Sequence, residues 1–413
     1  MDRPAGYESI REVFERKIAA YVGKKNAVLC SSARSAIRFS LLALRIGRGD
    51  EVVVPDLTCR LLPLVVYCTG AKPKFCDVET DNLALSPDSL SKVLSPNTKA
   101  VILVHPLGIP VDPSPFMEIA REKGVALIED AAQALGASVN GKKAGSFGDL
   151  GVFSFNKFLN VKSGGAVVTD SREIADRLKL IRQSFEARSY FAAVCFGFQN
   201  LFGLESDRAL RAIFLGDNYL HEILSFKFAT DRFPIAKGWV EADRSYLDRI
   251  VSSKGLQDEL LSLSSPYQNY IRRKLETFEV SVLESELENL DSYIRERRRL
   301  AESYRNNLSE EGFSKPVVLE NVVPSYLRYP ITFSDEKRWV ACIASLWHLG
   351  YRVDYVYKSL HSLPSFRPDN EGQLLSKSLY LSRHMLPLPL HPSLNEGDVQ
   401  KISSVVNSSI KMQ

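Results

Sequence analysis

The sequence predicts an α/β fold, in which a mostly parallel sheet is covered by helices on both faces and is followed by a smaller α+β region. Two observations support this prediction. Apolar runs of strand length recur between residues 27 and 169, and segments with helical spacing of apolar residues separate several of them. Most of the runs are continuous stretches of apolar residues such as Val, Ile and Leu, which is typical of strands buried on both faces of a parallel sheet.

The elements of this sheet follow one another along the chain. A short apolar run over 27–30 predicts the first strand, and apolar residues at helical spacing over 35–44 predict a helix that ends before Gly47. Further strands are expected at 51–54, 74–76, 100–104, 125–128, 151–155 and 166–169. Because ligands bind outside the carboxyl ends of the strands in such sheets, we expect the functional residues there.

A second region begins near residue 286. It is expected to hold a long charged helix over 284–307, a strand over 326–333, a helix over 339–349 and a strand over 351–355. This pattern predicts a small α+β domain. We therefore expect a large domain over residues 1–285 and a small C-terminal domain over residues 286–413.

Composition and charge exclude several classes of protein. The chain has 413 residues, of which 45% are hydrophobic and 25% charged, and this is enough to bury a large core. The formal net charge of +4 is small for this length, so nucleic-acid binding is not expected. The densest basic run, residues 295–299, follows acidic residues within the expected helix, which favours a solvated helix face over an anion site.

The cysteines and the N-terminus bear on metal binding and location. The six cysteines show no metal-type C-x-x-C spacing, so we expect reduced core residues and no metal site. Residues 1–4 lack an apolar signal core, and no run approaches the roughly 18 apolar residues that a membrane helix needs. A cytoplasmic location is therefore expected.

Three neighbouring stretches carry the chemistry. Residues 127–134 run from an apolar strand to Asp130 and small residues, residues 151–157 run from an aromatic strand to Lys157, and residues 163–168 contain a glycine pair. A pyridoxal phosphate (PLP) site needs these groups: Asp130 would keep the pyridinium nitrogen protonated and Lys157 would form the Schiff base. Taken singly, each has an ordinary explanation as a helix cap, a solvated lysine or a tight turn. Their order and spacing favour the PLP site.

The order of these motifs resembles the DegT/DnrJ/StrS family of sugar-nucleotide aminotransferases, a branch of the fold-type I PLP enzymes. Residues 47–55, 70–78, 104–108 and 387–394 also resemble segments that recur in this family. The likeness covers residues 1–185 and 275–413 and leaves 186–274 unmatched. It implies a three-layer α/β/α fold-type I PLP-transferase with a smaller C-terminal α+β domain.

The resemblance also implies an activity and an assembly. The acceptor would be a keto sugar linked to a nucleotide and the usual amino donor glutamate, in surface-polysaccharide or secondary-metabolite sugar biosynthesis. Lys157 would hold PLP and then act as general base and acid. Enzymes of this kind build each site at a two-fold interface, so we expect a homodimer with shared active sites. Asn269 is a candidate for the asparagine that the partner chain contributes.

The phosphate of PLP is expected at the start of the first core helix. Ser32, Ala33 and Arg34 occupy the family's phosphate loop, where Gly-Thr is commoner than Ala33-Arg34. An arginine can replace the threonine hydroxyl by a charge-assisted contact, and the alternative for Arg34 is a salt bridge elsewhere. Ser154 resembles the family's phosphate-contacting serine. Gln133 resembles the residue near the ring oxygen of PLP, or is an ordinary polar residue at a helix start.

Two departures from the family pattern concern the cofactor ring and the lysine. Cys59 follows Thr58, where the family usually has an aromatic residue that stacks on the pyridine ring, so the stacking group is missing or comes from elsewhere. The segment between Ser154 and the lysine is about two residues shorter than usual. Lys157 is favoured over Lys162 because its spacing to the glycine pair matches the family.

Three further residues are weaker candidates for substrate contact. Thr58, His105 and His361 lie in segments that resemble family segments near the cleft. A lone histidine beside apolar residues is more often a satisfied core or surface residue than a catalyst. The resemblance therefore indicates only that these residues lie near the site.

Other functions predict other residues. A PLP-dependent sugar dehydratase of the same family characteristically carries histidine where Lys157 stands, and a non-catalytic regulator would be expected to lose Asp130 or Lys157. A protein that binds PLP or a sugar nucleotide without turnover stays open. The unmatched residues 186–274 are expected to form a helical insert, whose aromatic-rich part, 190–230, packs on the protein, shapes the acceptor pocket or contacts a lipid-linked sugar at a membrane.

Overall fold

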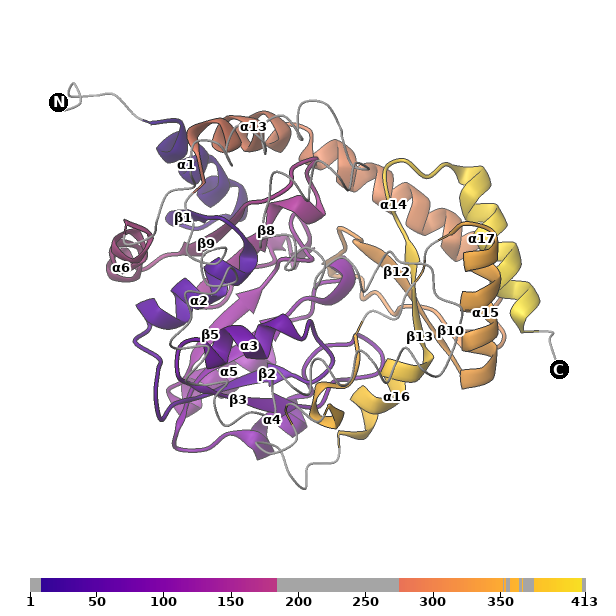
Figure 1. Ribbon diagram of the computed structural model, residues 1–413, viewed down its shortest axis with the longest axis horizontal. Helices are drawn as coiled ribbons and strands as arrows, with labels where there is room; N and C mark the ends of the chain where they lie inside the picture. Colours follow the sequence, from indigo (N-terminus) through magenta and orange to yellow (C-terminus); the bar gives the residue numbers. More distant parts are fainter. Residues whose placement is uncertain are drawn as a thin grey trace, which may run out of the picture.

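The computed structural model describes residues 9–183, 275–351, 353, 357–363, 366 and 375–410. These residues form a seven-stranded sheet with helices on both faces and a smaller sheet beside it (Figure 1). In spatial order the large sheet contains β1 (Asn26–Cys30), β9 (Gly165–Thr169), β8 (Leu150–Ser154), β5 (Ala126–Asp130), β4 (Thr98–Val104), β2 (Glu51–Pro55) and β3 (Lys72–Cys76). Strand β9 is antiparallel to both of its neighbours, whereas β8, β5, β4, β2 and β3 pair in parallel. The predicted mostly parallel sheet is confirmed.

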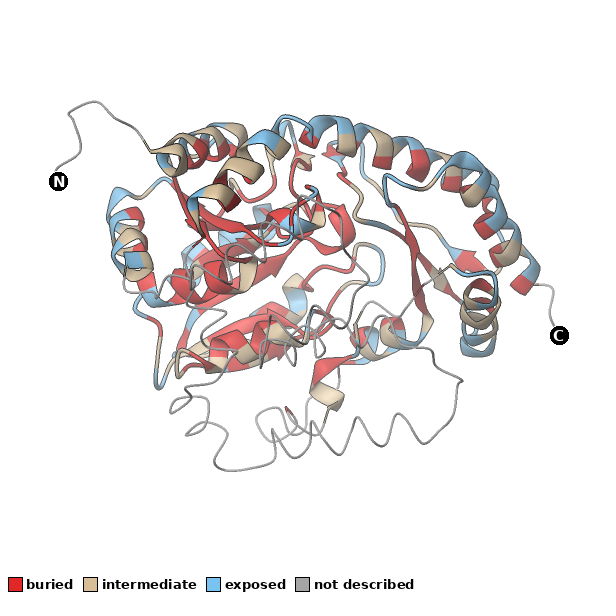
Figure 2. Cartoon of the chain, turned by 45° about the horizontal axis from the view of Figure 1, so that its top comes forward, coloured by how far each residue is buried: buried red, intermediate tan, exposed pale blue. Residues whose placement is uncertain are grey.

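The strands of this sheet are buried on both faces. In β1, Val28 packs with Phe39 of α2, whereas Leu29 packs on the opposite face with Phe14 of α1 and Leu283 of α13. Figure 2 shows the buried strands between layers of half-buried helices. The helices of these layers are α1 (Ile10–Val22), α2 (Ala33–Ala43), α3 (Leu61–Tyr67), α4 (Pro87–Val93), α5 (Ser114–Lys123), α6 (Arg172–Gln183) and α13 (Thr277–Leu287). This arrangement explains why most of the strand runs are continuous stretches of apolar residues.

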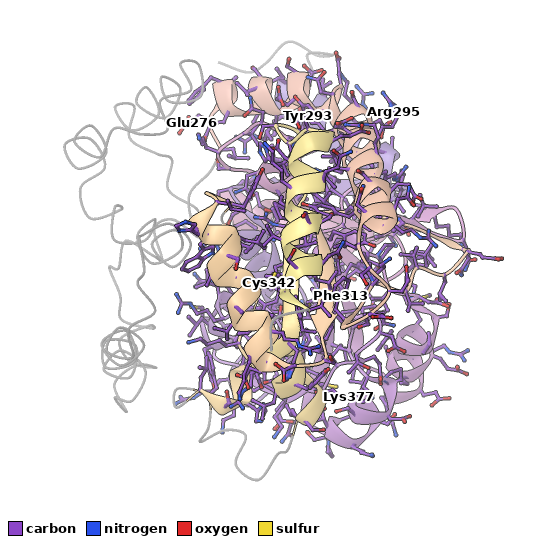
Figure 3. All side chains as sticks on the ribbon, turned by 90° about the vertical axis from the view of Figure 1, so that its right-hand side faces the viewer. Glu276, Tyr293, Arg295, Phe313, Cys342 and Lys377 are labelled. Carbon is purple, nitrogen blue, oxygen red and sulfur yellow. The ribbon has the colours of Figure 1, made fainter. Side chains whose placement is uncertain are left out.

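The C-terminal part has its own antiparallel sheet. Its strands lie in the order β10 (Phe313–Ser314), β12 (Arg328–Phe333) and β13 (Met385–Pro389). The helices of this part are α14 (Leu290–Asn307), α15 (Glu336–His348), α16 (Ser376–His384) and α17 (Glu396–Ser409). Figure 3 shows α17 lying between α14 and α15, which it contacts on either side. A third small sheet joins β6 (Ser138–Val139), β7 (Lys142–Lys143) and β11 (Val322–Val323).

Helix α14 connects the two cores. Leu290 and Ile294 near its start pack with α1 and α13, whereas Leu300 and Tyr304 pack in the core of the C-terminal sheet. A continuous helix therefore takes part in both parts of the molecule. The division of the chain between residues 285 and 286 stays a prediction.

Two predicted elements differ in the structure. The expected helix over 284–307 is two helices, because the Asn289 N–H bonds the Glu286 carbonyl three residues back (3.1 Å), which tightens the turn between α13 and α14. The expected strand over 351–355 is wrong at its described residues, since Tyr351 and Val353 belong to no strand. The Tyr351 N–H instead closes the end of α15 by donating to the Leu346 carbonyl at 2.9 Å.

Several predictions fall elsewhere in the chain. The expected insert 186–274, its aromatic-rich part 190–230 and Asn269 lie outside the described residues. Within the described ranges, no helix is long and apolar enough to cross a membrane. The same residues contain no cluster of three or more His, Cys, Asp or Glu side chains arranged to bind a metal ion.

Candidate active site

Lys157 and Asp130 lie at the carboxyl ends of neighbouring parallel strands. Strand β5 ends at Asp130, and β8 leads into the short 3₁₀ helix η2 (Phe155–Lys157). In the ladder, Asp130 is paired with Val152 of β8, so both side chains leave the sheet at the same edge. The Asp130 carboxylate accepts a hydrogen bond from the Ala132 N–H (3.0 Å), which holds the side chain at the start of the following turn.

The two side chains perturb each other electrostatically. Burial lowers the pKa of Lys157, and the negative charge of Asp130 opposes this shift. Burial raises the pKa of Asp130, and the positive charge of Lys157 opposes that shift in turn. The net lowering of the lysine pKa increases the neutral fraction of its amine, which is the form that attacks a carbonyl carbon.

The proposed phosphate loop lies beside this pair. Ser32 is the N-cap of α2, and its hydroxyl accepts the Ser35 N–H at 3.2 Å. Arg34 is half-buried in the first turn, close enough to Lys157 for its charge to lower the pKa of that lysine further. A helix start with a cationic side chain is suited to hold a phosphate group.

Strand β9 packs directly against this loop. A Cβ atom on Gly165 would lie 2.5 Å from the carbonyl carbon of Ser32 and 2.7 Å from the Ala33 nitrogen. Gly165 is also paired with Ser154 at the end of β8. The structure therefore brings Ser32, Ala33 and Ser154 together around one glycine, and the Ser154 hydroxyl donates to Asn156 Oδ1 at 2.8 Å. These residues fit the phosphate of a PLP group.

Gln133 lies in the turn after β5, and each polar atom of its amide forms a hydrogen bond. Its Oε1 atom accepts the Leu107 N–H at 3.2 Å, and its Nε2 group donates to the Tyr357 hydroxyl at 2.7 Å. Tyr357 thus reaches the cofactor region from the C-terminal part of the chain. No prediction from the sequence included Tyr357, which lies two residues beyond the strand expected over 351–355.

His105 belongs to a buried network. Its side chain has no exposed surface, its Nδ1 accepts the Val111 N–H (3.2 Å), and its Nε2 lies 2.9 Å from Glu129 Oε2. Because Nδ1 is an acceptor, Nε2 carries the proton and donates to the carboxylate. The His105 backbone N–H donates to the Asp130 carbonyl at 3.1 Å. The ring therefore supports the strand that presents Asp130, and both of its nitrogens are occupied within the protein.

Glu129 gathers four donors with one carboxylate. Oε1 accepts the N–H groups of Phe147 and Gly148 (both 2.6 Å), and Oε2 accepts the Gly145 N–H (2.9 Å) and His105. Burial alone would raise the pKa of Glu129, but the hydrogen bonds and the His105 interaction outweigh it and lower the pKa. Glu129 directly precedes Asp130, so its four hydrogen bonds hold the end of β5 in place.

His361 is bonded to Asp56, which directly follows β2 and lies two residues before Thr58. Thr58 is buried, and the carboxylate of Asp56, two residues before it, accepts the His361 N–H (2.6 Å). His361 Nδ1 lies 2.9 Å from Asp56 Oδ2, and the Ser359 hydroxyl donates to the same oxygen at 2.6 Å. Leu57 and Ser359 also form an antiparallel bridge. These contacts thus hold His361 at the carboxyl end of β2.

Cys59 lies at the site without an aromatic ring. The thiol is exposed, and it lies close enough to Lys157 and Tyr357 to influence their pKa values. The position predicted for the stacking residue therefore borders the Lys157 region. Tyr357 is the aromatic residue next to it whose hydroxyl the structure ties to Gln133.

Arg297 is a second residue that the sequence analysis misread. The basic run was expected to be a solvated face, but Arg297 is only 4% exposed. Its guanidinium donates to the carbonyls of Leu390 (2.6 Å) and Lys157 (3.1 Å), and lies over the Phe158 ring. The spacing of Ile294, Arg297 and Leu300 on one helical face was the available signal.

Comparison with known proteins identifies the family. The model of the DegT/DnrJ/EryC1/StrS aminotransferase family matches residues 7–200 and 265–407. The chain belongs to this family. The resemblance predicted from the sequence is therefore confirmed.

The names of two relatives refer to nucleotide-linked sugars. The chain is 40% identical over 172 residues to GDP-perosamine synthase of Caulobacter vibrioides, covering 41% of this chain and 46% of that protein. It is 38% identical over 179 residues to UDP-N-acetyl-3-dehydro-alpha-D-glucosamine 3-aminotransferase of Acidithiobacillus ferrooxidans, covering 43% and 48%. The chain thus spans about half the length of the curated relatives it matches.

Solved structures of other proteins share the fold. DesV of S. venezuelae, in complex with a ketimine intermediate, has a TM-score of 0.72 at 24% identity, covering 99% of this chain and 92% of that one. The putative sugar aminotransferase Spr1654 of Streptococcus pneumoniae, in its PMP form, has a TM-score of 0.72 at 18% identity, covering 98% and 92%. These likenesses confirm the predicted fold-type I PLP-transferase architecture.

Proposed function

We propose that this protein is a PLP-dependent aminotransferase that transfers an amino group to a keto sugar linked to a nucleotide, with glutamate as the donor. The observation that carries the proposal is the placement of Lys157 and Asp130 at the carboxyl ends of neighbouring parallel strands, beside the start of α2. Membership of the family supports the reaction. The names of the two relatives, which act on GDP- and UDP-linked sugars, support the substrate class.

Lys157 and Asp130 would have different roles in the reaction. When bound, PLP supplies an electron sink for the charge left at carbon after proton removal. Lys157 Nζ would attach the cofactor and, once released, would take and return the proton at the substrate carbon. Asp130 would hold the proton on the ring nitrogen. Since burial makes an isolated charge at Asp130 costly, a cationic ring nitrogen beside it is favourable.

The phosphate and the ring oxygen would have separate partners. Ser32, Ala33, Arg34 and Ser154 surround the start of α2 and would hold the phosphate through hydroxyl groups, backbone N–H groups and one guanidinium. Gln133, which lies three residues beyond Asp130 and donates to the Tyr357 hydroxyl, would lie near the ring oxygen. Thr58 and His361 would contact the substrate. His105, whose N–H donates to the Asp130 carbonyl, would support the strand end.

Borohydride trapping tests the cofactor and the lysine together. Purified protein incubated with PLP and reduced should carry the cofactor on the peptide that contains Lys157. The variant Lys157→Arg should abolish the label, and Lys162→Arg, which changes the other lysine near the glycine pair, should retain it. Label on Lys162 would refute the assignment of Lys157. Label on neither residue would favour the non-catalytic alternative.

A turnover assay tests the reaction. The PLP-loaded protein is incubated with glutamate and a panel of nucleotide-linked keto sugars, and release of 2-oxoglutarate is followed. Release that depends on one of these sugars is the expected result. Labelled protein that releases no 2-oxoglutarate with any of them would point to other PLP chemistry, such as the dehydratase reaction.

Assembly and location form part of the same proposal. We expect a homodimer in which each chain completes the other's site, and a cytoplasmic location. Light scattering of the purified protein measures the first property. A monomer with full activity would contradict the shared site.

A further inference from the structure

Tyr357 is held at the site by a hydrogen bond whose direction can be read from the structure. The Leu107 N–H donates to Gln133 Oε1 at 3.2 Å, which fixes the orientation of the amide. The opposite group, Nε2, therefore faces Tyr357, and it is a donor only. The bond of 2.7 Å between Nε2 and the hydroxyl must use an oxygen lone pair of Tyr357. The hydroxyl proton of Tyr357 is not engaged in this bond.

That proton meets no acceptor among the described residues. The Tyr357 hydroxyl forms a single hydrogen bond with them, the one that it receives from Gln133. Its ring packs on an apolar cluster that includes Leu57 and Leu107 and keeps part of its surface exposed. The ring is thus anchored on one side, while the O–H group is left to donate elsewhere.

The surroundings keep this group protonated and place it near the chemistry. Burial raises the pKa of Tyr357, and the charges of Cys59 and Asp130 raise it further. A tyrosine in this setting donates a proton in a hydrogen bond at neutral pH and does not ionise. The bond to Gln133, three residues after Asp130, places the hydroxyl at the turn that follows the end of β5.

We propose that Tyr357 is an active-site hydrogen-bond donor, whose hydroxyl binds a ligand oxygen held beside Gln133. This proposal rests on the proposed function. The oxygen has either of two sources, the ring oxygen of PLP or an oxygen of the acceptor sugar. The tyrosine comes from the C-terminal part of the chain, so it also links ligand binding at the large sheet to the position of that segment.

The test replaces the hydroxyl and keeps the ring. Tyr357→Phe should weaken PLP binding at least about fivefold if the oxygen belongs to the cofactor, as expected for one lost hydrogen bond. It should also shift the visible absorption maximum of bound PLP. If the oxygen belongs to the sugar, PLP affinity and absorption stay unchanged and KM for the acceptor rises by a similar factor. Tyr351→Phe, which removes a hydroxyl that donates to Asp398 at 2.9 Å, is the matched control.

A second variant tests the direction of the bond. Gln133→Glu keeps an acceptor for Leu107 but replaces the donor that faces Tyr357 by an oxygen. The Tyr357 O–H group would then donate its hydrogen bond to this carboxylate and would no longer donate to the ligand. The effects of Gln133→Glu and Tyr357→Phe should therefore be less than additive in the double variant.

The outcomes separate this proposal from the proposed function. Wild-type protein that takes up no PLP in the borohydride experiment would overturn the proposed function itself. If the wild type binds PLP, and Tyr357→Phe matches Tyr351→Phe in PLP affinity, absorption maximum and acceptor KM, the role assigned to Tyr357 is wrong. Fully additive effects of Gln133→Glu and Tyr357→Phe would overturn the direction of the hydrogen bond.

Discussion

Replacing Glu129 by glutamine tests the network behind Asp130. Each carboxylate oxygen accepts two donors, and a glutamine has one oxygen and one N–H₂ group. In either orientation of the amide, its N–H₂ group faces two of the four N–H donors that the carboxylate accepts. His105 cannot become an acceptor at Nε2, because its Nδ1 already accepts the Val111 N–H. Two buried donors without partners cost about 1–3 kcal/mol each, so Glu129→Gln should lower the free energy of unfolding by about 2–6 kcal/mol.

Urea unfolding of the cofactor-free protein measures this change, with circular dichroism as the signal. Glu118→Gln, at an exposed position of α5, is the matched control and should change stability by less than about 0.5 kcal/mol. A loss below about 1 kcal/mol for Glu129→Gln would refute the reasoning, because it would mean that the four donors do not depend on the carboxylate.

The same network predicts a pH dependence. The pKa of Glu129 is lowered in the folded protein, so the stabilisation from its ionised form is fully present above the unfolded value of about 4.3. It is lost as the pH falls through the lower, folded pKa. The stability difference between the wild type and Glu129→Gln should therefore be constant from neutral pH to about 5 and shrink at more acidic pH. A difference that stayed constant in acid would contradict this assignment.

Three further variants have defined expectations. Asp130→Asn should still bind PLP but lower the turnover rate at least about a hundredfold, or about 2.7 kcal/mol of barrier, and near-normal steady-state kinetics would show that another residue protonates the ring. Gly165→Ala places a carbon 2.5 Å from backbone and should cost about 1–3 kcal/mol in urea unfolding and weaken PLP binding, whereas Gly397→Ala in the first turn of α17 should do neither. Arg297→Met should cost about 3 kcal/mol or more because buried carbonyls lose a charged donor, against less than about 1 kcal/mol for exposed Arg299→Met. Equal stability of the two arginine variants would contradict the buried role.

The large sheet was predictable because its signals are local. Residues 27–30 and 166–169, for example, are apolar on both faces of the strand, and both segments are strands in the structure. The break between α13 and α14 was not predictable from spacing, since Leu283, Leu290 and Ile294 keep a helical period across it. The turn at Asn289 depends on backbone hydrogen bonds that leave no trace in the apolar pattern.

The positions of candidate site residues were predictable where the residue directly ends or follows a strand that the sequence also predicts. Asp130 and Lys157 follow buried strands, and the topology brings them to one edge of the sheet. Tyr357 and Arg297 act through partners that are 224 and 140 residues away in the chain, and no local pattern encodes such contacts. The charge of Arg297 also favoured the wrong prediction of a solvated side chain, because a guanidinium is usually exposed unless carbonyl groups surround it.

The hydrogen bonds of Arg297 to the Lys157 and Leu390 carbonyls have a consequence for the order of folding. The turn that presents Lys157 is held by a side chain 140 residues later, and that side chain is itself held by the Leu390 carbonyl, 93 residues further on. Contacts of such long sequence separation form late, since their loop-closure entropy must be overcome first. A nascent chain that has not reached Leu390 therefore lacks part of the support for the turn at Lys157. The position of Lys157 therefore depends on synthesis of the chain at least as far as Leu390.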